Sequence, residues 1–283
     1  MKKIFLLMTL LLMTYAGFSQ TAEECFNKGI DKSILNDYSG AIVDFNKAIE
    51  INPEYENAFY WRGDLKSKLK DYSGAIADYN KAIDINPMVA SYYYFRAKAK
   101  NNLKDYTGAI VDFNKAMEIY PEFAEAYSER GIAKFCLKDY YGAIADFTKA
   151  IEFISIVISI SADNYQAIAV YGGAYSFRGM AKSNLEDYTG AIADFTKAIE
   201  VYPEIENSYY YRGDSKSNLK DYYGAIADYT KAIEINPKYA AAYKNRGLAK
   251  LELGQKENGC LDLSKAGELG YTEAYDAIQK YCQ

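Results

Sequence analysis

The sequence contains no histidine among its 283 residues, and it has only one tryptophan, five prolines and four cysteines. Without histidine, the chain lacks the general base of Ser-His-Asp and Cys-His catalysis and the commonest protein ligand of metals. No pair of its cysteines has the spacing of a zinc or redox motif. We therefore expect no catalytic residue, no metal site and no cofactor, so the chain is not expected to be an enzyme.

Long apolar runs are also scarce, and the one at the N-terminus is short. Lys2 and Lys3 precede a mainly apolar stretch that ends at Gly17, too short to span a bilayer comfortably. Gly17 and Ser19 are the small residues expected before a cleavage site, so residues 1–19 are interpreted as a secretory signal peptide. The alternative is an uncleaved membrane anchor. Export would place the mature chain in the periplasm, at the outer-membrane periphery or outside the cell, with no transmembrane span.

The charges form no block of one sign. The formal net charge is −5, and removal of residues 1–19 leaves 31 basic against 38 acidic side chains, a net charge of −7. An acidic chain without a basic block is a poor ligand for nucleic acid. We therefore expect no nucleic-acid partner.

What the sequence has in abundance is tyrosine, with 30 residues, together with a repeat. The string Asp-Tyr-x-Gly-Ala-Ile-x-Asp-(Phe/Tyr)-x-Lys-Ala recurs with spacings of 34 residues and one spacing of 48. Its copies begin at Asp37, Asp71, Asp105, Asp139, Asp187 and Asp221, and a degenerate seventh copy begins at Gln255. A fixed period of this length indicates a stacked repeat architecture.

One repeat, residues 56–89, shows the expected local structure. Ile76, Tyr79 and Ile83 follow the stripe of an amphipathic helix, and Asp71 stands where it can cap that helix. Pro87 cannot continue the helix and so ends it. Each repeat is therefore predicted to be a helix hairpin, helix A followed by helix B. Stacked hairpins share one continuous core, so no domain boundary is expected inside residues 22–271.

The order of small and large residues resembles the tetratricopeptide repeat (TPR) family over almost all of the mature chain. The signature residues are Gly29, Ala41, Phe45, Ala48 and Pro53 in the first repeat and Gly213, Ala225, Tyr229, Ala232 and Pro237 in the sixth. The resemblance implies an all-α fold, a right-handed superhelical solenoid of antiparallel helix hairpins. It also implies a non-enzymatic scaffold that binds peptide or protein segments in its concave groove.

The predicted organisation has seven TPR-like repeats, a 14-residue insertion around residues 155–171 and a capping helix over residues 272–283. The repeats are expected at residues 22–55, 56–89, 90–123, 124–157, 172–205, 206–239 and 240–271.

Partner choice is expected where repeats differ on the groove face of helix A, a face that the family resemblance assigns. The candidate groove residues are Tyr60, Asp64, Tyr94, Lys98, Ser128, Ser176, Tyr210, Asp214 and Lys244. The aromatic side chains would give rigid contact area with a polar tip. Alternatively they only cover the solenoid surface, or they act as stacking platforms in a cell-envelope carbohydrate- or peptidoglycan-binding module.

Charged residues that recur in nearly every repeat cannot encode one partner. The helix A arginines, such as Arg62, and the helix B aspartates, such as Asp78, predict a ladder of contacts between neighbouring hairpins. As exposed pairs they would contribute roughly 0.2–1 kcal/mol each. The alternative is a charged stripe that binds a ligand.

The insertion is unusually apolar between residues 151 and 161. Split evenly, its 14 residues would lengthen two helices by two turns each, although the alternating isoleucines fit a strand equally well. We favour the helix, because a lone strand has no pairing partner in a helical stack. The isoleucines form a candidate docking or self-association patch, and the alternative is packing between the two lengthened helices. The patch consists of Ile154, Ile156, Ile158 and Ile160.

Two of the four cysteines lie near the C-terminus. Cys260 falls on a helix B and Cys282 at the end of the last helix, so we predict a disulfide that fastens the cap in an oxidising compartment. The alternative is two buried thiols. Cys25 is expected in the core and Cys136 on helix A, towards the groove.

Overall fold

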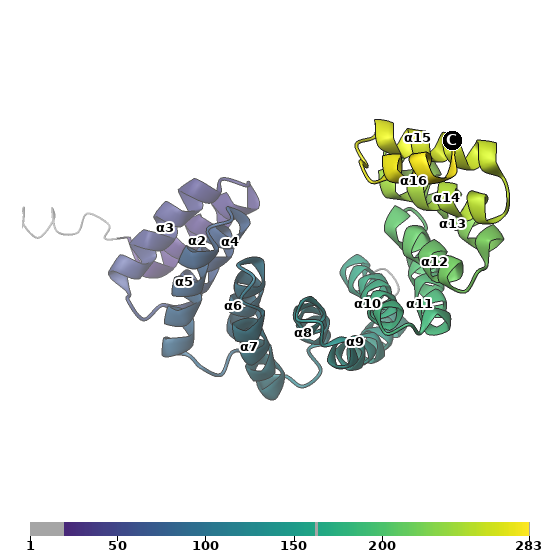
Figure 1. Cartoon of the computed structure of the whole chain (residues 1–283). Coiled ribbons are helices and arrows are strands. Elements are labelled where there is room, and N and C mark those ends of the chain that lie inside the picture. The colour runs from purple at the N-terminus through teal and green to yellow at the C-terminus, as the bar shows by residue number, and fades with distance from the viewer. Residues whose placement is uncertain (1–19, 162–163, 283) are drawn as a thin grey trace, which may run out of the picture. The chain divides into compact units, whose positions relative to one another are not determined.

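The computed structural model describes residues 20–161 and 164–282, so the predicted signal peptide, residues 1–19, lies outside the described residues. Every regular element within these ranges is an α-helix (Figure 1). The contacts divide the chain into two compact units, of which unit 1 ends at Pro121 and unit 2 begins at Glu122. The repeat pattern gave no reason to expect this division, and each unit is described by itself.

Helices of similar length follow one another as hairpins in both units. Unit 1 contains α2 (Ala22–Ile34), α3 (Tyr38–Ile51), α4 (Glu56–Lys68), α5 (Tyr72–Ile85), α6 (Ala90–Asn102) and α7 (Tyr106–Ile119). Unit 2 contains α8 (Ala124–Cys136), α9 (Tyr140–Ile160), α10 (Tyr165–Asn184), α11 (Tyr188–Val201), α12 (Glu206–Asn218), α13 (Tyr222–Ile235), α14 (Ala240–Glu252), α15 (Lys256–Glu268) and α16 (Ala274–Tyr281). The predicted all-α hairpin fold is confirmed.

Small residues let the two helices of a hairpin approach closely. In the hairpin of α4 and α5, Ala75, Tyr79 and Ala82 are fully buried. A Cβ atom added to Gly63 on α4 would lie 2.9 Å from the Tyr79 ring, which is too close for any larger residue. The large ring therefore fills the space that the glycine leaves open.

The turn between helix A and helix B uses a backbone conformation that the repeat string did not reveal. As predicted, Asp71 caps α5, and its side chain accepts a hydrogen bond of 2.9 Å from the backbone N–H of Gly74. In every hairpin, the residue just before the N-cap of helix B has a positive φ. In six of the hairpins this residue is not glycine. These residues are Asn36, Lys70, Lys104, Lys138, Glu186 and Lys220, whereas the last hairpin has Gly254.

The recurrent arginines and aspartates pair within each hairpin, so the predicted ladder of Arg–Asp contacts between neighbouring hairpins is wrong. Arg178 donates two hydrogen bonds, of 2.9 and 2.7 Å, to Asp194 of its own hairpin, and Lys182 lies 2.8 Å from the same carboxylate. The link to the preceding hairpin is a different one, from Arg178 to the hydroxyl of Thr148. Asp194 is only 3% exposed, so the small stabilisation expected of a solvent-exposed ion pair does not apply to it. Loss of one partner of such a buried pair would lower the free energy of unfolding by about 3–5 kcal/mol. The Arg–Asp network consists of such pairs at residues 62 and 78, 96 and 112, 130 and 146, 178 and 194, 212 and 228, and 246 and 262.

The described part of the insertion is helical, so the strand alternative is wrong. Helix α9 has 21 residues and α10 has 20, whereas the next helix B, α11, has 14 and the next helix A, α12, has 13. The seven additional residues in each correspond to two turns, about 10 Å of helix. Only part of the proposed isoleucine patch is surface. Ile154 is buried and Ile158 packs against the same core, whereas Ile156 and Ile160 are 55% and 82% exposed.

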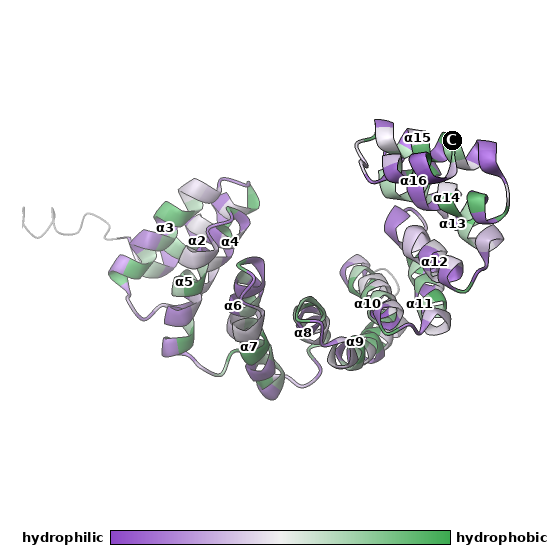
Figure 2. Ribbon diagram, in the orientation of Figure 1, coloured by the Kyte–Doolittle hydropathy of each residue, from purple (hydrophilic) through white to green (hydrophobic). Residues whose placement is uncertain are grey.

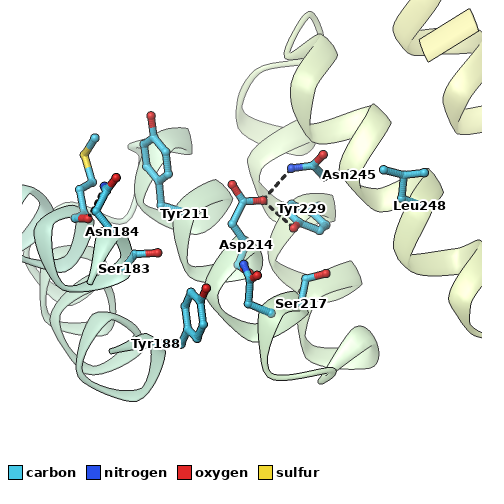
Figure 3. Close-up of a pocket in the computed structure, with 11 residues that line it drawn as sticks. Ser183, Asn184, Tyr188, Tyr211, Asp214, Ser217, Tyr229, Asn245 and Leu248 are labelled. Carbon is cyan, nitrogen blue, oxygen red and sulfur yellow. Dashed lines mark hydrogen bonds between the residues drawn. The ribbon is translucent and has the colours of Figure 1, made fainter. Parts of the chain in front are cut away.

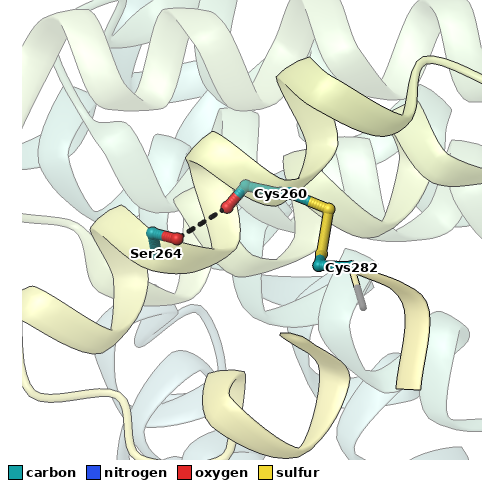
Figure 4. Close-up of a disulfide and its surroundings, with 3 residues drawn as sticks. All are labelled: Cys260, Ser264 and Cys282. Atoms are coloured by element: carbon teal, nitrogen blue, oxygen red, sulfur yellow. Dashed lines mark hydrogen bonds between the residues drawn. A yellow bond between two sulfur atoms is a disulfide. The ribbon is translucent and has the colours of Figure 1, made fainter. Parts of the chain in front are cut away.

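The C-terminal helix α16 packs against α15, and a disulfide joins the two elements (Figure 4). It links Cys260 and Cys282, the pair named from the sequence, with their Cα atoms 5.8 Å apart. Of the other cysteines, Cys25 is buried and Cys136 is exposed. Apolar and polar residues are interspersed along the helices (Figure 2). Across residues 20–161 and 164–282, no helix combines the length and the apolar character needed to cross a membrane.

Candidate partner-binding site

Unit 2 contains a pocket of about 450 Å³ that is bordered by five consecutive helices, α10 to α14 (Figure 3). Helix α12 contributes the largest share of the lining. The lining residues are Met180, Ser183, Asn184, Tyr188, Tyr211, Asp214, Ser217, Asn218, Tyr229, Asn245 and Leu248. Polar side chains and aromatic rings predominate, and none of the described lining residues is lysine or arginine.

Asp214 is the only charged side chain among these lining residues, and neutral donors hold it in place. Its Oδ1 atom accepts hydrogen bonds of 2.7 Å from the Tyr229 hydroxyl and of 2.7 Å from the Asn245 side-chain amide. The same amide donates to the hydroxyl of Tyr210. Burial raises the pKa of Asp214 above its ordinary value, and this effect outweighs the hydrogen bonds from Tyr229, Asn245 and Tyr210 and the weaker attraction of Lys244, which oppose it. The pocket therefore presents a carboxylate that is short of stabilising positive charge.

The hairpin of α4 and α5 in unit 1 carries a near copy of this arrangement, with two differences. Asp64 and Tyr79 occupy the positions of Asp214 and Tyr229, but Lys68 lies 2.9 Å from the Asp64 carboxylate. Phe95 stands where α14 has Asn245. The Tyr79 hydroxyl is buried without a hydrogen-bond partner among the described residues. The pocket in unit 2 is therefore distinguished by a missing cation and an added amide.

In unit 2, the structure brings two of the predicted groove residues together and leaves three apart. Asp214 lines the pocket, and Tyr210 is linked to it through Asn245. Ser176 shares a hydrogen bond of 3.0 Å with Ser208, and the Lys244 ammonium lies over the ring of Tyr271. The remaining residue, Ser128, is buried.

In unit 1, most of the predicted groove residues belong to aromatic clusters. The Tyr60 ring lies 5.3 Å from that of Tyr92 and 5.5 Å from that of Phe95. Tyr94 is only 8% exposed, and the ammonium of Lys98 lies over its ring. Asp64 is engaged by Lys68, as described above. The ring of Tyr210 in unit 2 similarly packs on neighbouring tyrosines, so no observation favours tyrosines as open stacking platforms for carbohydrate.

Sequence reasoning missed several pocket residues, above all Tyr229 and Asn245. Tyr229 was assigned to the core, although a signal was present. The two repeats with aspartate on helix A, at positions 64 and 214, are the two with tyrosine at the core position of helix B. The other repeats have Phe or Leu there, paired with Ile, Lys, Met or Leu on helix A. This internal covariation could have linked Tyr229 to Asp214, although only Tyr229 and not Tyr79 makes the hydrogen bond.

The stacked hairpins define the chain as an α-helical repeat protein. Matches to the tetratricopeptide repeat coincide with the predicted repeats at residues 56–87, 90–123, 172–205 and 207–239. A further tetratricopeptide repeat match covers residues 228–260, and a TPR repeat match covers residues 34–70. The chain belongs to the tetratricopeptide repeat family. A search of curated protein sequences found no match. TPR repeats support a role as a protein–protein interaction scaffold, and their fold is typically non-catalytic.

Several solved structures share the fold at low sequence identity. A TPR protein from Parabacteroides merdae is 22% identical, with 93% of this chain and 99% of that chain covered and a TM-score of 0.59. YrrB, described as a TPR protein with an unusual peptide-binding site, is 21% identical, with 71% and 97% covered and a TM-score of 0.58. PilF of Pseudomonas aeruginosa is 13% identical, with 80% and 96% covered and a TM-score of 0.65. Within the described ranges, no three His, Cys, Asp or Glu side chains gather as metal ligands.

Proposed function

We propose that the helix A face of unit 2, around the Asp214 pocket, binds a polypeptide segment of a partner protein. The observation that carries this proposal is the pocket itself, whose lining includes positions that differ between repeats, such as Asp214, Asn245 and Leu248. The recurrent charges are paired in the Arg–Asp network and do not line this pocket. YrrB is a TPR protein with a described peptide-binding site, which agrees with a role of this kind for the fold.

A photo-crosslinking experiment with matched tyrosine positions tests the proposal. Tyr211 lines the pocket, whereas Tyr223 lies on helix B of the same hairpin and is 73% exposed. Each is replaced by the photo-reactive residue p-benzoylphenylalanine, and the chain is irradiated in the cells that produce it. Crosslinked partners are then identified by mass spectrometry.

We expect a defined protein partner to crosslink from position 211 and not from position 223. A second pocket position, Leu248 on α14, should crosslink to the same segment of that partner. Equal crosslinking from positions 211 and 223 would contradict the proposal, because it would show that the pocket face is not preferred.

We further propose that the scaffold is non-enzymatic and acts outside the cytoplasm. The basic and apolar N-terminus with small residues before position 20 supports export. The disulfide between Cys260 and Cys282 supports it independently, because disulfides persist mainly in oxidising compartments.

A further inference from the structure

We propose that the Asp214 pocket binds a basic side chain, lysine or arginine, from the partner segment. This inference rests on the proposed function, because it names the chemical group that the same pocket recognises. It rests on a comparison between two copies of one structural element within this chain.

The first step concerns the lysine that pairs with the equivalent aspartate in unit 1. In α4 the carboxylate of Asp64 has a lysine partner one helical turn later, with Lys68 Nζ 2.9 Å from Asp64 Oδ2. In α12 the residue at that position is Asn218, and its side-chain amide donates instead to the backbone carbonyl of Asp214. The pocket therefore has the carboxylate but not the lysine that neutralises its counterpart in unit 1.

The second step is the acceptor that is left over. The hydrogen bonds from Tyr229 and Asn245 both end on Oδ1 of Asp214, and Figure 3 shows both dashed lines at that single oxygen. The Tyr210 hydroxyl is a third neutral donor to the same carboxylate. The neighbouring cation on α14, Lys244, places its ammonium over the ring of Tyr271 in the next hairpin. A carboxylate offers about four acceptor sites, so three neutral donors leave capacity for a further donor that enters the pocket from outside.

The third step is the lining around that carboxylate. Tyr188 and Tyr211 bring aromatic rings to the pocket, which attract cations through their faces and pack against an alkyl stem. The hydroxyls of Ser183 and Ser217 add acceptors for the remaining N–H groups. A basic side chain would supply the positive charge that the buried carboxylate lacks, whereas an acidic or apolar side chain would leave it uncompensated.

The test uses small capped amino acids as probes, so that no partner needs to be known. Nα-acetyl-lysine amide and Nα-acetyl-arginine amide are titrated into the isotope-labelled chain, and the side-chain amide signals of Asn245 and Asn218 are followed by NMR. Nα-acetyl-norleucine amide is the neutral control, because it has a similar stem without the charge. We expect saturable shifts with at least one basic probe and none with the norleucine probe.

The decisive variant is Asn218→Lys, which restores the internal cation that unit 1 has at Lys68. The Asp64–Lys68 pair shows that the repeat tolerates this arrangement, so the variant should fold. We expect it to weaken binding of the basic probe by about tenfold or more, and Asp214→Asn to do the same. Asp64→Asn in unit 1 is the matched control and should bind as the wild type does.

Three results with the probes would overturn the inference: no binding of either basic probe, binding of the norleucine probe as tightly as the basic probes, or unchanged binding in Asn218→Lys. The crosslinking experiment distinguishes failure of this inference from failure of the proposed function. If a partner crosslinks at position 211 equally well in the wild type and in Asn218→Lys, the pocket binds polypeptide without reading a basic side chain. If the basic probes bind but no polypeptide crosslinks, the cation site stands and the polypeptide-binding function is wrong.

Discussion

At the scale of single residues, two equivalent tyrosine hydroxyls differ in whether they form a hydrogen bond. Tyr229 donates to the buried carboxylate of Asp214, and a hydrogen bond to a charged group contributes about 1.5–3 kcal/mol. We expect Tyr229→Phe to lower the free energy of unfolding, measured in urea, by about 2 kcal/mol. Tyr79→Phe is the matched control and should be neutral or stabilising, because the Tyr79 hydroxyl is buried without a partner among the described residues. Equal losses in the two variants would contradict this assignment.

A second residue-scale prediction concerns the pH dependence of stability at Asp214. Burial raises the pKa of Asp214 in the folded state above its ordinary value of 3.8. The folded chain therefore holds this proton to a higher pH than the unfolded chain does. Stability from this group is fully present below the unfolded value and is lost as pH rises through the folded value.

The measurement compares urea unfolding of the wild type with that of Asp214→Asn from pH about 4 to about 7. The asparagine side chain keeps an oxygen acceptor without the charge. We expect the variant to be the more stable protein at neutral pH, and the difference to shrink towards the acidic end. A constant difference across this range would show that the carboxylate is not strained by burial. The same variant should lose binding of the basic probe, so stability and recognition oppose each other at this residue.

At the scale of elements, the turn between helix A and helix B contains a strained backbone conformation that glycine would relieve. Lys138 adopts φ of 63°, a left-handed conformation that costs a non-glycine residue roughly 1–2 kcal/mol. We expect Lys138→Gly to raise the free energy of unfolding by about 0.5–1 kcal/mol, since glycine gives back part of the gain as entropy of the unfolded chain. Gly254→Lys should have the opposite effect, because Gly254 occupies the same place in the last hairpin with φ of 75°. Stabilisation by the glycine at the exposed helical position Lys231 would contradict the argument, because glycine destabilises a helix interior.

The lengthened helices carry the second prediction at this scale. Self-association through the insertion stays a prediction, and the exposures now assign it to Ile156 and Ile160 rather than to the buried Ile154. We expect the wild-type chain to self-associate in analytical ultracentrifugation and the double variant Ile156→Ser, Ile160→Ser to be monomeric. Ile34 and Leu35, which are also exposed apolar residues, provide a control pair in unit 1. A monomeric wild type, or equal mass in both variants, would contradict docking through this patch.

The elements show why the fold was more predictable than the site. A capping aspartate such as Asp71 and a large ring such as that of Tyr79 recur in all hairpins but the last, so local pattern sufficed to predict the helix pairs and the two-turn extensions. The positive φ at Lys138 was missed because no side-chain pattern marks it. The Arg–Asp pairs were placed between hairpins because the period cannot distinguish a contact within a hairpin from one to the next.

At the scale of the whole molecule, the pocket depends on differences between copies that no single repeat displays. Asp214 was selected from the sequence because it breaks the period, but Tyr229 matches a scaffold position and Asn245 lies one residue beyond the predicted groove position at Lys244. Only packing of α12 between α10 and α14 brings these side chains together. A comparison of the two aspartate-bearing hairpins would have shown that Asn218 stands where the other hairpin has Lys68.

The last prediction joins the two ends of the chain. If residues 1–19 direct export, Cys260 and Cys282 meet in an oxidising compartment and form the disulfide that holds α16 on α15. We expect alkylation under denaturing, non-reducing conditions, after the cells are quenched with acid, to label Cys25 and Cys136 only, as read by mass spectrometry. Deletion of residues 2–19 should retain the chain in the reducing cytoplasm and expose all four thiols to the reagent. Cys282→Ser, in the chain with its N-terminus intact, is the control, because it should add one labelled thiol at Cys260 without changing location. Protection of Cys260 and Cys282 in the deletion variant would contradict export as the source of the oxidised cap.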